Sequence, residues 1–176
     1  MVKIVQKDDP ILRQTAVDVS LVEIKSAKLQ KLLAKMSQAL TEQEDGVALA
    51  APQIGEAKRI FIIAGKMLSR TDSETETKTP APDLVFINPK LLKTSRRKKN
   101  MEEGCLSVRW LYGTTKRANK ATVEAYDQNG QKFIRHGTGL MAQIFQHEID
   151  HLVGILFIDN ATDIKEIKPN TNNNDE

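Results

Sequence analysis

The stretch that decides the fold is QHEIDHLVG, residues 146–154. It places His147 and His151 four residues apart, with Glu148 directly after the first of them. Glycines flank the apolar-periodic segment that contains this stretch, and they predict a helix over residues 138–153. Side chains at i and i+4 lie on the same face of a helix, so the two imidazoles should point the same way.

The two histidines continue an apolar stripe of the predicted helix. Leu140, Ile144, His147 and His151 fall within about 60° of one another around the helix axis. A single histidine on such a stripe is more often a hydrogen-bonded core residue than a ligand. Two of them beside Glu148 instead favour a divalent metal, because buried imidazole nitrogens need partners and a cation uses one nitrogen from each ring.

A catalytic metal site of this type needs about three protein ligands and an open position for water. Metalloproteases with an extended motif carry a histidine six residues after the second one, where this chain has Phe157, so a protease is the weaker interpretation. The segment EEGCLSV, residues 102–108, holds the only cysteine, Cys105, directly after Gly104. There are two alternatives to a ligand role for this cysteine: it could be a small buried core residue, or it could form a nucleophile pair with a histidine. Beside two histidines that lack a third ligand, thiolate coordination is the better prediction.

These ligands would suit hydrolytic chemistry. One thiolate and two neutral imidazoles leave a divalent ion with a net charge of about +1, so a bound water should lose its proton near neutral pH. Glu148 could accept that proton and pass it to a leaving nitrogen. A non-catalytic structural ion would normally have four protein ligands, and the remaining histidine, His136, is more simply explained as a surface or capping residue.

A second candidate segment is GVALAAPQIG, residues 46–55, which is built from small residues. Such a segment could be only a tight turn with close packing. A carbonyl hydrolase, however, needs donors aimed at the developing oxyanion, and Gln53 beside backbone N–H groups could supply one. The small side chains would also let an extended peptide lie close to the chain.

Composition limits the classes of protein. The chain has 176 residues, of which 40% are hydrophobic and 28% charged, with a net charge of +3. We expect one catalytic domain over residues 1–165 and a disordered polar tail over residues 166–176. The small net charge gives no reason to expect sequence-specific nucleic acid binding. No apolar run approaches the ~18 to 20 residues that cross a bilayer, and no signal peptide is evident, so no membrane contact and a cytoplasmic location are expected.

Local patterns predict an α+β fold with antiparallel sheets, because strands dominate and helices are few. Residues 29–40 have the spacing of an amphipathic helix. An Asn-Gly pair predicts a hairpin between residues 121–126 and 132–136. The remaining expectations are strands at 59–64, 84–89 and 155–158, an extended or looped arm around DDPILR (8–13) with Pro10 in a turn, a long loop at 69–82 and a solvated basic loop, KTSRRKK, at 93–99.

Together, "GVALAAPQ", "EGCLS" and "QHEIDH" resemble, in order, the three motifs of the peptide deformylases, which remove the formyl group from the N-terminal formylmethionine of new polypeptides. The resemblance implies mixed antiparallel sheets around a central helix that carries the HExxH motif. It implies metal ligation by Cys105, His147 and His151, usually of Fe²⁺, with Zn²⁺, Ni²⁺ or Co²⁺ able to replace it. It also implies that Glu148 is the general acid/base.

The same resemblance implies roles around the substrate, an N-formylmethionyl peptide. Gln53 and the Leu106 N–H would stabilise the oxyanion. The residues implied in peptide alignment or in the methionine pocket are Gly46, Val47, Gly104, Leu106, Ile144 and His147.

The chain also departs from the family pattern. Ala48 replaces a motif glycine, and Arg109 and Trp110 stand where proline and glycine commonly follow "CLSV". Substrate preference could therefore differ. The basic run at 93–99 allows transient ribosome association as a further expectation, against the default of a solvated loop.

Overall fold

The computed structural model describes residues 2–67 and 81–169, which form two antiparallel sheets and three α-helices. A five-stranded sheet has the order β1-β2-β3-β6-β7, and a three-stranded sheet has the order β4-β5-β8. The strands are β1 (Ala48–Ala50), β2 (Ile60–Ile63), β3 (Leu84–Thr94), β4 (Lys98–Gly104), β5 (Leu111–Ala118), β6 (Lys120–Tyr126), β7 (Lys132–Thr138) and β8 (Thr162–Glu166). The helices are α1 (Leu21–Ile24), α2 (Ala27–Thr41) and α3 (Leu140–His151). The α+β prediction is confirmed.

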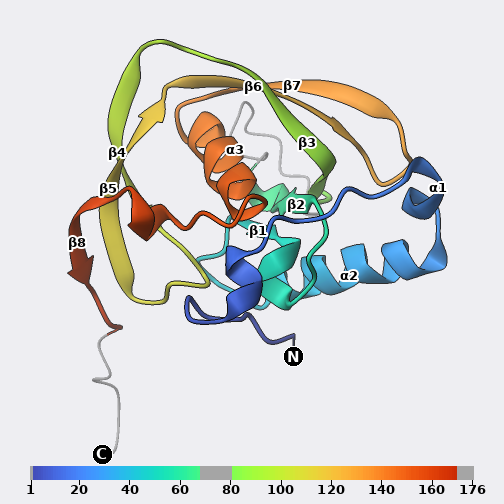
Figure 1. The fold of residues 1–176 in the computed structure, drawn as a ribbon, viewed down its shortest axis with the longest axis horizontal. Helices are drawn as coiled ribbons and strands as arrows, with labels where there is room; N and C mark the ends of the chain where they lie inside the picture. Colours follow the sequence, from blue (N-terminus) through green and yellow to red (C-terminus); the bar gives the residue numbers. More distant parts are fainter. Residues whose placement is uncertain (1, 68–80, 170–176) are drawn as a thin grey trace, which may run out of the picture.

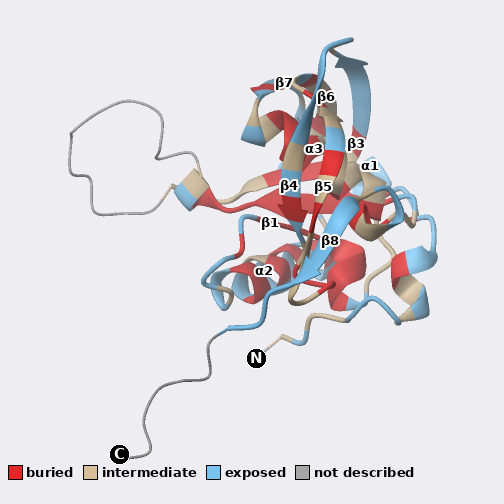
Figure 2. Ribbon diagram, turned by 90° about the vertical axis from the view of Figure 1, so that its left-hand side faces the viewer, coloured by how far each residue is buried: buried red, intermediate tan, exposed pale blue. Residues whose placement is uncertain are grey.

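Helix α3 is the central element. Figure 1 shows it between the two sheets, with β4 and β5 on one side and β3, β6 and β7 arching around the other. Its apolar residue Phe145 packs 5.4 Å from the ring of Phe86, which itself stacks on Phe61 at 4.4 Å. Figure 2 shows buried residues concentrated where α3 meets the sheets. This aromatic contact determines which face of α3 turns toward the five-stranded sheet.

The ends of α3 differ slightly from the sequence prediction. Thr138 is the last residue of β7, so the helix begins two residues later than expected. Gly139 makes the turn between them with φ 55°, a conformation that favours glycine. At the other end Gly154 has φ 77°, and a Cβ placed there would lie 2.6 Å from the carbonyl oxygen of Arg13. The glycine therefore lets the amino-terminal segment cross close to the end of the helix.

Helix α2 and the hairpin agree with their predictions. The Ser26 hydroxyl accepts a hydrogen bond from the Leu29 N–H at 3.2 Å, which caps the start of α2. The buried face of this helix comprises Leu29, Leu33, Met36, Ala39 and Leu40. Strands β6 and β7 pair in the expected hairpin, with Gly130 at φ 78° in the turn. His136 lies exposed on β7, next to Thr122.

One local prediction just after α3 was wrong. The segment expected as a strand at 155–158 contains instead a single 3-10 turn, Phe157–Asp159, and the last strand is β8, which pairs with β5. The Asp159 carboxylate accepts the Leu156 N–H at 2.9 Å and so stabilises the turn. The stretch around DDPILR, where a turn at Pro10 was expected, forms a 3-10 turn, Pro10–Arg13, capped by Asp9. An apolar tetrapeptide satisfies a buried turn as well as a strand, and tertiary contacts decide between them.

Three further expectations concern the basic run, the long loop and the polar tail. The prediction of a loop over the whole basic run at 93–99 was wrong, because β3 continues to Thr94, β4 starts at Lys98 and only residues 95–97 connect them. The long loop expected at 69–82 falls mostly outside the described residues, as do residues 170–176 of the expected tail. Strand β8 reaches Glu166, one residue into that tail, and the Ile167 N–H donates to the Trp110 carbonyl at 2.7 Å. In the part of the chain that the structure describes, no helix is long and apolar enough to cross a membrane.

Candidate metal centre and active site

Helix α3 and the segment after β4 bring three potential metal ligands together. The ligand atoms of Cys105, His147 and His151 all lie within 4.8 Å of one another. The Cys105 sulfur is 3.2 Å from Nε2 of His151, and the two imidazole rings are 5.0 Å apart. The predicted juxtaposition of one sulfur and two imidazoles is therefore present. Thiolate and imidazole are donors typical of zinc, iron and related divalent ions.

The polar face of α3 fixes this geometry. Gln143 donates to the Glu102 carbonyl of β4 at 2.8 Å, and Gln146 donates to the Ala118 carbonyl of β5 at 2.9 Å. Gln146 also accepts the Ala118 N–H at 3.0 Å. The three-stranded sheet thus hydrogen-bonds along the helix and holds Cys105, one residue beyond β4, against the two histidines.

Sequence reasoning missed a carboxylate that supports the histidines. Glu103 is 5% exposed, and its Oε2 lies 3.1 Å from Nδ1 of His147. Arg117 donates to both oxygens of Glu103, at 2.7 and 3.0 Å, and also to Asp150 at 2.5 Å. Burial alone would raise the pKa of Glu103, but the hydrogen bonds from His147 and Arg117 outweigh it and hold that pKa well below its usual range. Its position next to the Gly-Cys pair was the only sequence signal.

The Glu103 contact leaves Nε2 of His147 available to an ion, the arrangement common for histidine ligands. Burial would lower the pKa of His147, whereas its contacts with Cys105 and Glu103 raise it above the ordinary value. A metal cation bound to the His147 ring would compete with the proton that the raised pKa keeps there. Burial, with His147 nearby, lowers the pKa of His151 and favours the neutral ring that coordinates metals.

Glu148 is buried beside this cluster. It is 4% exposed, and its Oε2 has no hydrogen-bond partner among the described residues. Burial raises its pKa to about 7, with the charge of His147 opposing the shift and that of Glu103 adding to it. A buried carboxylate without a protein partner is costly. Burial, an unpartnered oxygen and a pKa near neutrality are typical of a carboxyl group that exchanges a proton with a bound molecule.

Gln53 faces the sulfur from the other side of the centre. Its Nε2 donates to the Cys105 sulfur at 3.4 Å and to the Ser107 hydroxyl at 3.1 Å. Its Oε1 accepts the Ala50 N–H at 2.8 Å, so the side-chain amide is held in one orientation. This orientation keeps an N–H donor next to the three potential metal ligands.

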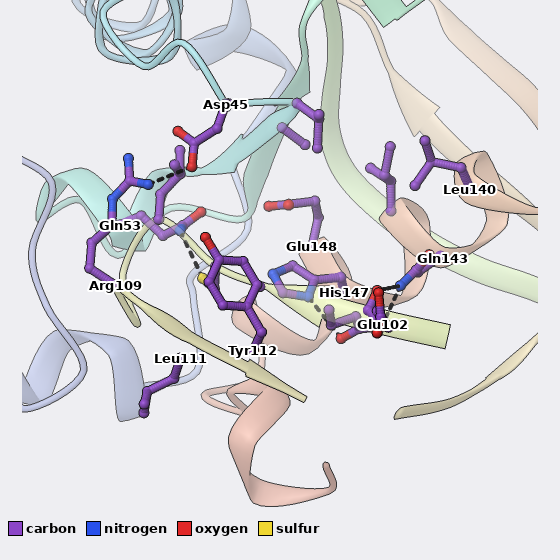
Figure 3. A pocket seen from close by; sticks show the side chains of 18 of the residues that line it. Asp45, Gln53, Glu102, Arg109, Leu111, Tyr112, Leu140, Gln143, His147 and Glu148 are labelled. Carbon is purple, nitrogen blue, oxygen red and sulfur yellow. Dashed lines mark hydrogen bonds and ion pairs between the residues drawn. The ribbon is translucent and has the colours of Figure 1, made fainter. Parts of the chain in front are cut away.

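A cavity of about 280 Å³ opens onto these groups. It is lined by the residues predicted for the substrate, Gly46, Val47, Gly104, Leu106, Ile144 and His147. Figure 3 shows Leu140 and Gln143 on one side of the cavity, Arg109 and Asp45 on the other, and Glu148 between them. Leu140, expected on an inward stripe, is 50% exposed at the mouth. Tyr112 also lines the cavity and was not predicted.

Comparison with known proteins shows which family the chain resembles. The chain matches the family described as polypeptide deformylase over residues 1–167. A protein from Clostridium acetobutylicum named peptide deformylase 2 is 38% identical over 156 residues, which cover 89% of this chain and 92% of that relative. A peptide deformylase from Mesorhizobium japonicum is 40% identical over 157 residues, covering 89% and 82% of the two chains.

Solved structures agree as well. A class I type b peptide deformylase from Acinetobacter baumannii with actinonin bound has a TM-score of 0.78 at 31% identity, covering 92% of this chain and 99% of that one. The same protein with Met-Ala-Ser bound has a TM-score of 0.77 at 32% identity, covering 91% and 99%. These matches confirm the resemblance of the three motifs, and the chain belongs to the polypeptide deformylase family.

Proposed function

We propose that this protein removes the formyl group from N-formylmethionyl peptides, with Glu148 as its general acid/base. The observation that carries the assignment of Glu148 is its burial beside the three-ligand cluster, with one carboxylate oxygen unpartnered among the described residues. Hydrolysis of an amide needs a group that takes a proton from the attacking water and returns it to the leaving amine.

The residues present fit a divalent ion. Cys105, His147 and His151 would hold it, because their donor atoms converge and Glu103 orients one of the rings. We propose Fe²⁺, with Zn²⁺, Ni²⁺ or Co²⁺ as replacements, since sulfur and imidazole donors suit all four. When bound, such an ion supplies Lewis-acid activation of water and of the formyl carbonyl.

The remaining residues bind and orient the peptide. The chain segment at Gly46 and Val47 aligns the peptide backbone along the cavity edge, and Gly104 allows it close approach. Leu106, Ile144 and His147 border the methionine side chain. The Gln53 amide and the Leu106 N–H donate to the oxygen of the formyl group as it becomes an oxyanion. Glu148 then protonates the departing amine, and formate leaves.

The decisive experiment measures formate release from formyl-Met-Ala-Ser by enzyme prepared anaerobically with Fe²⁺. Glu148→Ala should keep its metal and lose about 10²- to 10⁴-fold in rate, which is the usual contribution of a general acid/base. Acetyl-Met-Ala-Ser serves as a second substrate. Cleavage of its internal peptide bonds would instead indicate a protease, and absence of formate release by metal-loaded enzyme would remove the proposed activity.

We also propose that the enzyme works in the cytoplasm and contacts ribosomal RNA transiently. The basic corner consists of Lys93, Arg96, Arg97, Lys98, Lys99, Lys116 and Lys120, all exposed. None of these side chains pairs with a carboxylate of residues 2–67 or 81–169. Their positive charges exceed the net charge of +3, so the rest of the chain is net negative. A concentrated cationic corner suits a phosphate backbone.

A matched pair of variants tests the RNA contact. One variant changes Arg96, Arg97, Lys98 and Lys99 to Gln, and the control changes Lys25, Lys28, Lys31 and Lys35, on and just before α2, to Gln. Cosedimentation with ribosomes and the salt dependence of binding to a uridine oligonucleotide are measured for both. We expect only the first variant to weaken binding and flatten the salt dependence. Equal losses would mean that net charge alone attracts RNA.

A further inference from the structure

The chain makes a strained turn directly after the cysteine segment. The Leu111 N–H donates to the Val108 carbonyl at 3.3 Å, and Trp110, between them, has φ 67°. A turn with positive φ at its third residue alone strongly favours glycine there. Tryptophan, with a large Cβ substituent, pays a steric cost at this position. The backbone would be more relaxed with glycine, so its conformation does not account for tryptophan at this position. A role of the indole side chain would account for it.

The side chain of Trp110 lies at the active-site cavity. Trp110 is half-buried and lines the same cavity as Cys105 and Glu148. The next two residues, Leu111 and Tyr112, line it too. The turn therefore presents a continuous apolar and aromatic wall to whatever occupies the cavity.

Arg109 holds this wall in place. Its guanidinium donates to the Asp45 carboxylate and to the Gln43 side-chain oxygen, each at 2.6 Å. Its Cζ also lies 5.4 Å from the centre of the Trp110 ring. Figure 3 shows the Arg109 and Asp45 side chains joined on the side of the cavity away from Leu140 and Gln143. Because Asp45 neutralises the guanidinium, this wall offers a ligand mainly aromatic and aliphatic surface.

We propose that Trp110, positioned by Arg109, is a specificity-determining residue that contacts the peptide beyond its methionine and favours aromatic or long aliphatic side chains there. The inference rests on the proposed function, in which Ile144 and His147 border the methionine side chain on the α3 side of the cavity. The peptide residues that follow methionine would then contact the wall at Trp110, on the other side of the cavity. Glu102 also lines the cavity, so acidic residues at those positions should be disfavoured.

The first test compares substrates that differ only after methionine. Formyl-Met-Leu-Phe, formyl-Met-Ser-Ser, formyl-Met-Asp-Asp and formyl-Met amide are assayed with metal-loaded wild type, Trp110→Gly and Trp110→Phe. The ratio of kcat/KM for formyl-Met-Leu-Phe to that for formyl-Met-Ser-Ser should fall about fivefold to tenfold in Trp110→Gly, mainly through KM. Trp110→Phe should recover most of the ratio, because an aromatic ring is restored. An unchanged ratio in Trp110→Gly would overturn the proposal.

A second glycine substitution separates strain from contact. Asp163 also has positive φ, at 53°, but it lies on β8 and does not line the cavity. Asp163→Gly relieves the same kind of backbone strain, and it should leave the substrate ratio at the wild-type value. If it lowered the ratio as much as Trp110→Gly, the effect would come from backbone flexibility and the proposal would fail.

The second test is spectroscopic and independent of turnover. Trp110 is the only tryptophan of the chain, so its fluorescence reports this wall alone. Titration of the wild-type holoenzyme with the product Met-Leu-Phe should shift or quench the emission, whereas Met amide should change it much less. Equal responses to both ligands would place the following residues away from Trp110 and overturn the proposal. Formate release from formyl-Met amide in the same preparation shows separately whether the proposed activity is present.

Discussion

The Glu103 carboxylate lies 3.1 Å from Nδ1 of His147, although the two residues are 44 positions apart in the chain. Arg117 donates to both oxygens of the same carboxylate. The imidazole is therefore oriented by a buried anion that is itself held by a partly buried cation. Such supporting carboxylates fix the ring and raise the basicity of the nitrogen that would face an ion.

This contact predicts a loss of metal affinity in Glu103→Gln. The amide keeps the shape of the side chain but removes the charge next to His147, so divalent metal affinity should fall about 10- to 100-fold. Competition with a chromophoric chelator measures it. Glu102→Gln is the matched control, because it removes an equal charge one residue away and leaves the partner of Nδ1 in place. Wild-type affinity in Glu103→Gln would contradict the supporting role.

A second prediction concerns Gln53. In Gln53→Glu an oxygen can still accept the Ala50 N–H, but the N–H donor beside Cys105 is lost. If that donor stabilises the oxyanion, kcat should fall about 10²- to 10³-fold with a smaller change in KM. Ser107→Ala removes only the hydroxyl next to the amide and should cost much less. Steady-state kinetics on formyl-Met-Ala-Ser distinguish the two, and equal losses would argue against the donor role.

Gly154 should tolerate no side chain. Its φ is 77°, and an added Cβ would lie 2.6 Å from the Arg13 carbonyl oxygen, a backbone atom that cannot move aside alone. Gly154→Ala should lower the free energy of unfolding by about 2 to 4 kcal/mol, from left-handed strain and overpacking together. Gly55→Ala is the control, because Gly55 has φ 83° but no heavy atom within 4 Å of the added Cβ. It should cost about 1 kcal/mol. Urea unfolding measures both, and equal costs would mean that the contact with Arg13 is unimportant.

The Arg13–Asp159 pair predicts a pH-dependent contribution to stability. The hydrogen bond from Arg13 lowers the pKa of Asp159, despite the opposing effect of partial burial. A carboxylate with a lowered folded-state pKa stabilises the fold above its unfolded pKa and loses that contribution as the pH falls through the folded value. Both side chains are more than a third exposed, so solvent screens the pair and Asp159→Asn should cost no more than about 1 kcal/mol at pH 7.

The measurement for this pair is a Tm series from pH 7 to pH 2. The gap between wild type and Asp159→Asn should be constant near neutral pH and close below the usual pKa of an aspartate. A gap that widened toward acid pH would contradict the sign of the shift.

The sequence by itself determined which residues are the candidate metal ligands and which main elements surround them. A spacing of four residues places His147 and His151 on one helix face, and alternation with an Asn-Gly turn specifies the β6–β7 hairpin. These are properties of short segments, so they follow from local geometry. The scarcity of thiols and imidazoles then singled out Cys105 as the candidate third ligand.

Only the tertiary structure decided which distant residues complete the site. Glu103 and Arg117 meet His147 because β4 pairs with β5 and both lie along α3, and no local pattern encodes that pairing. The same holds for the turn at Phe157–Asp159, which resembles a strand in sequence, and for Trp110, whose positive φ depends on its surroundings. Burial, backbone strain and hydrogen-bond partners depend on contacts between segments that are distant in the sequence. Such contacts exist only once the chain has folded.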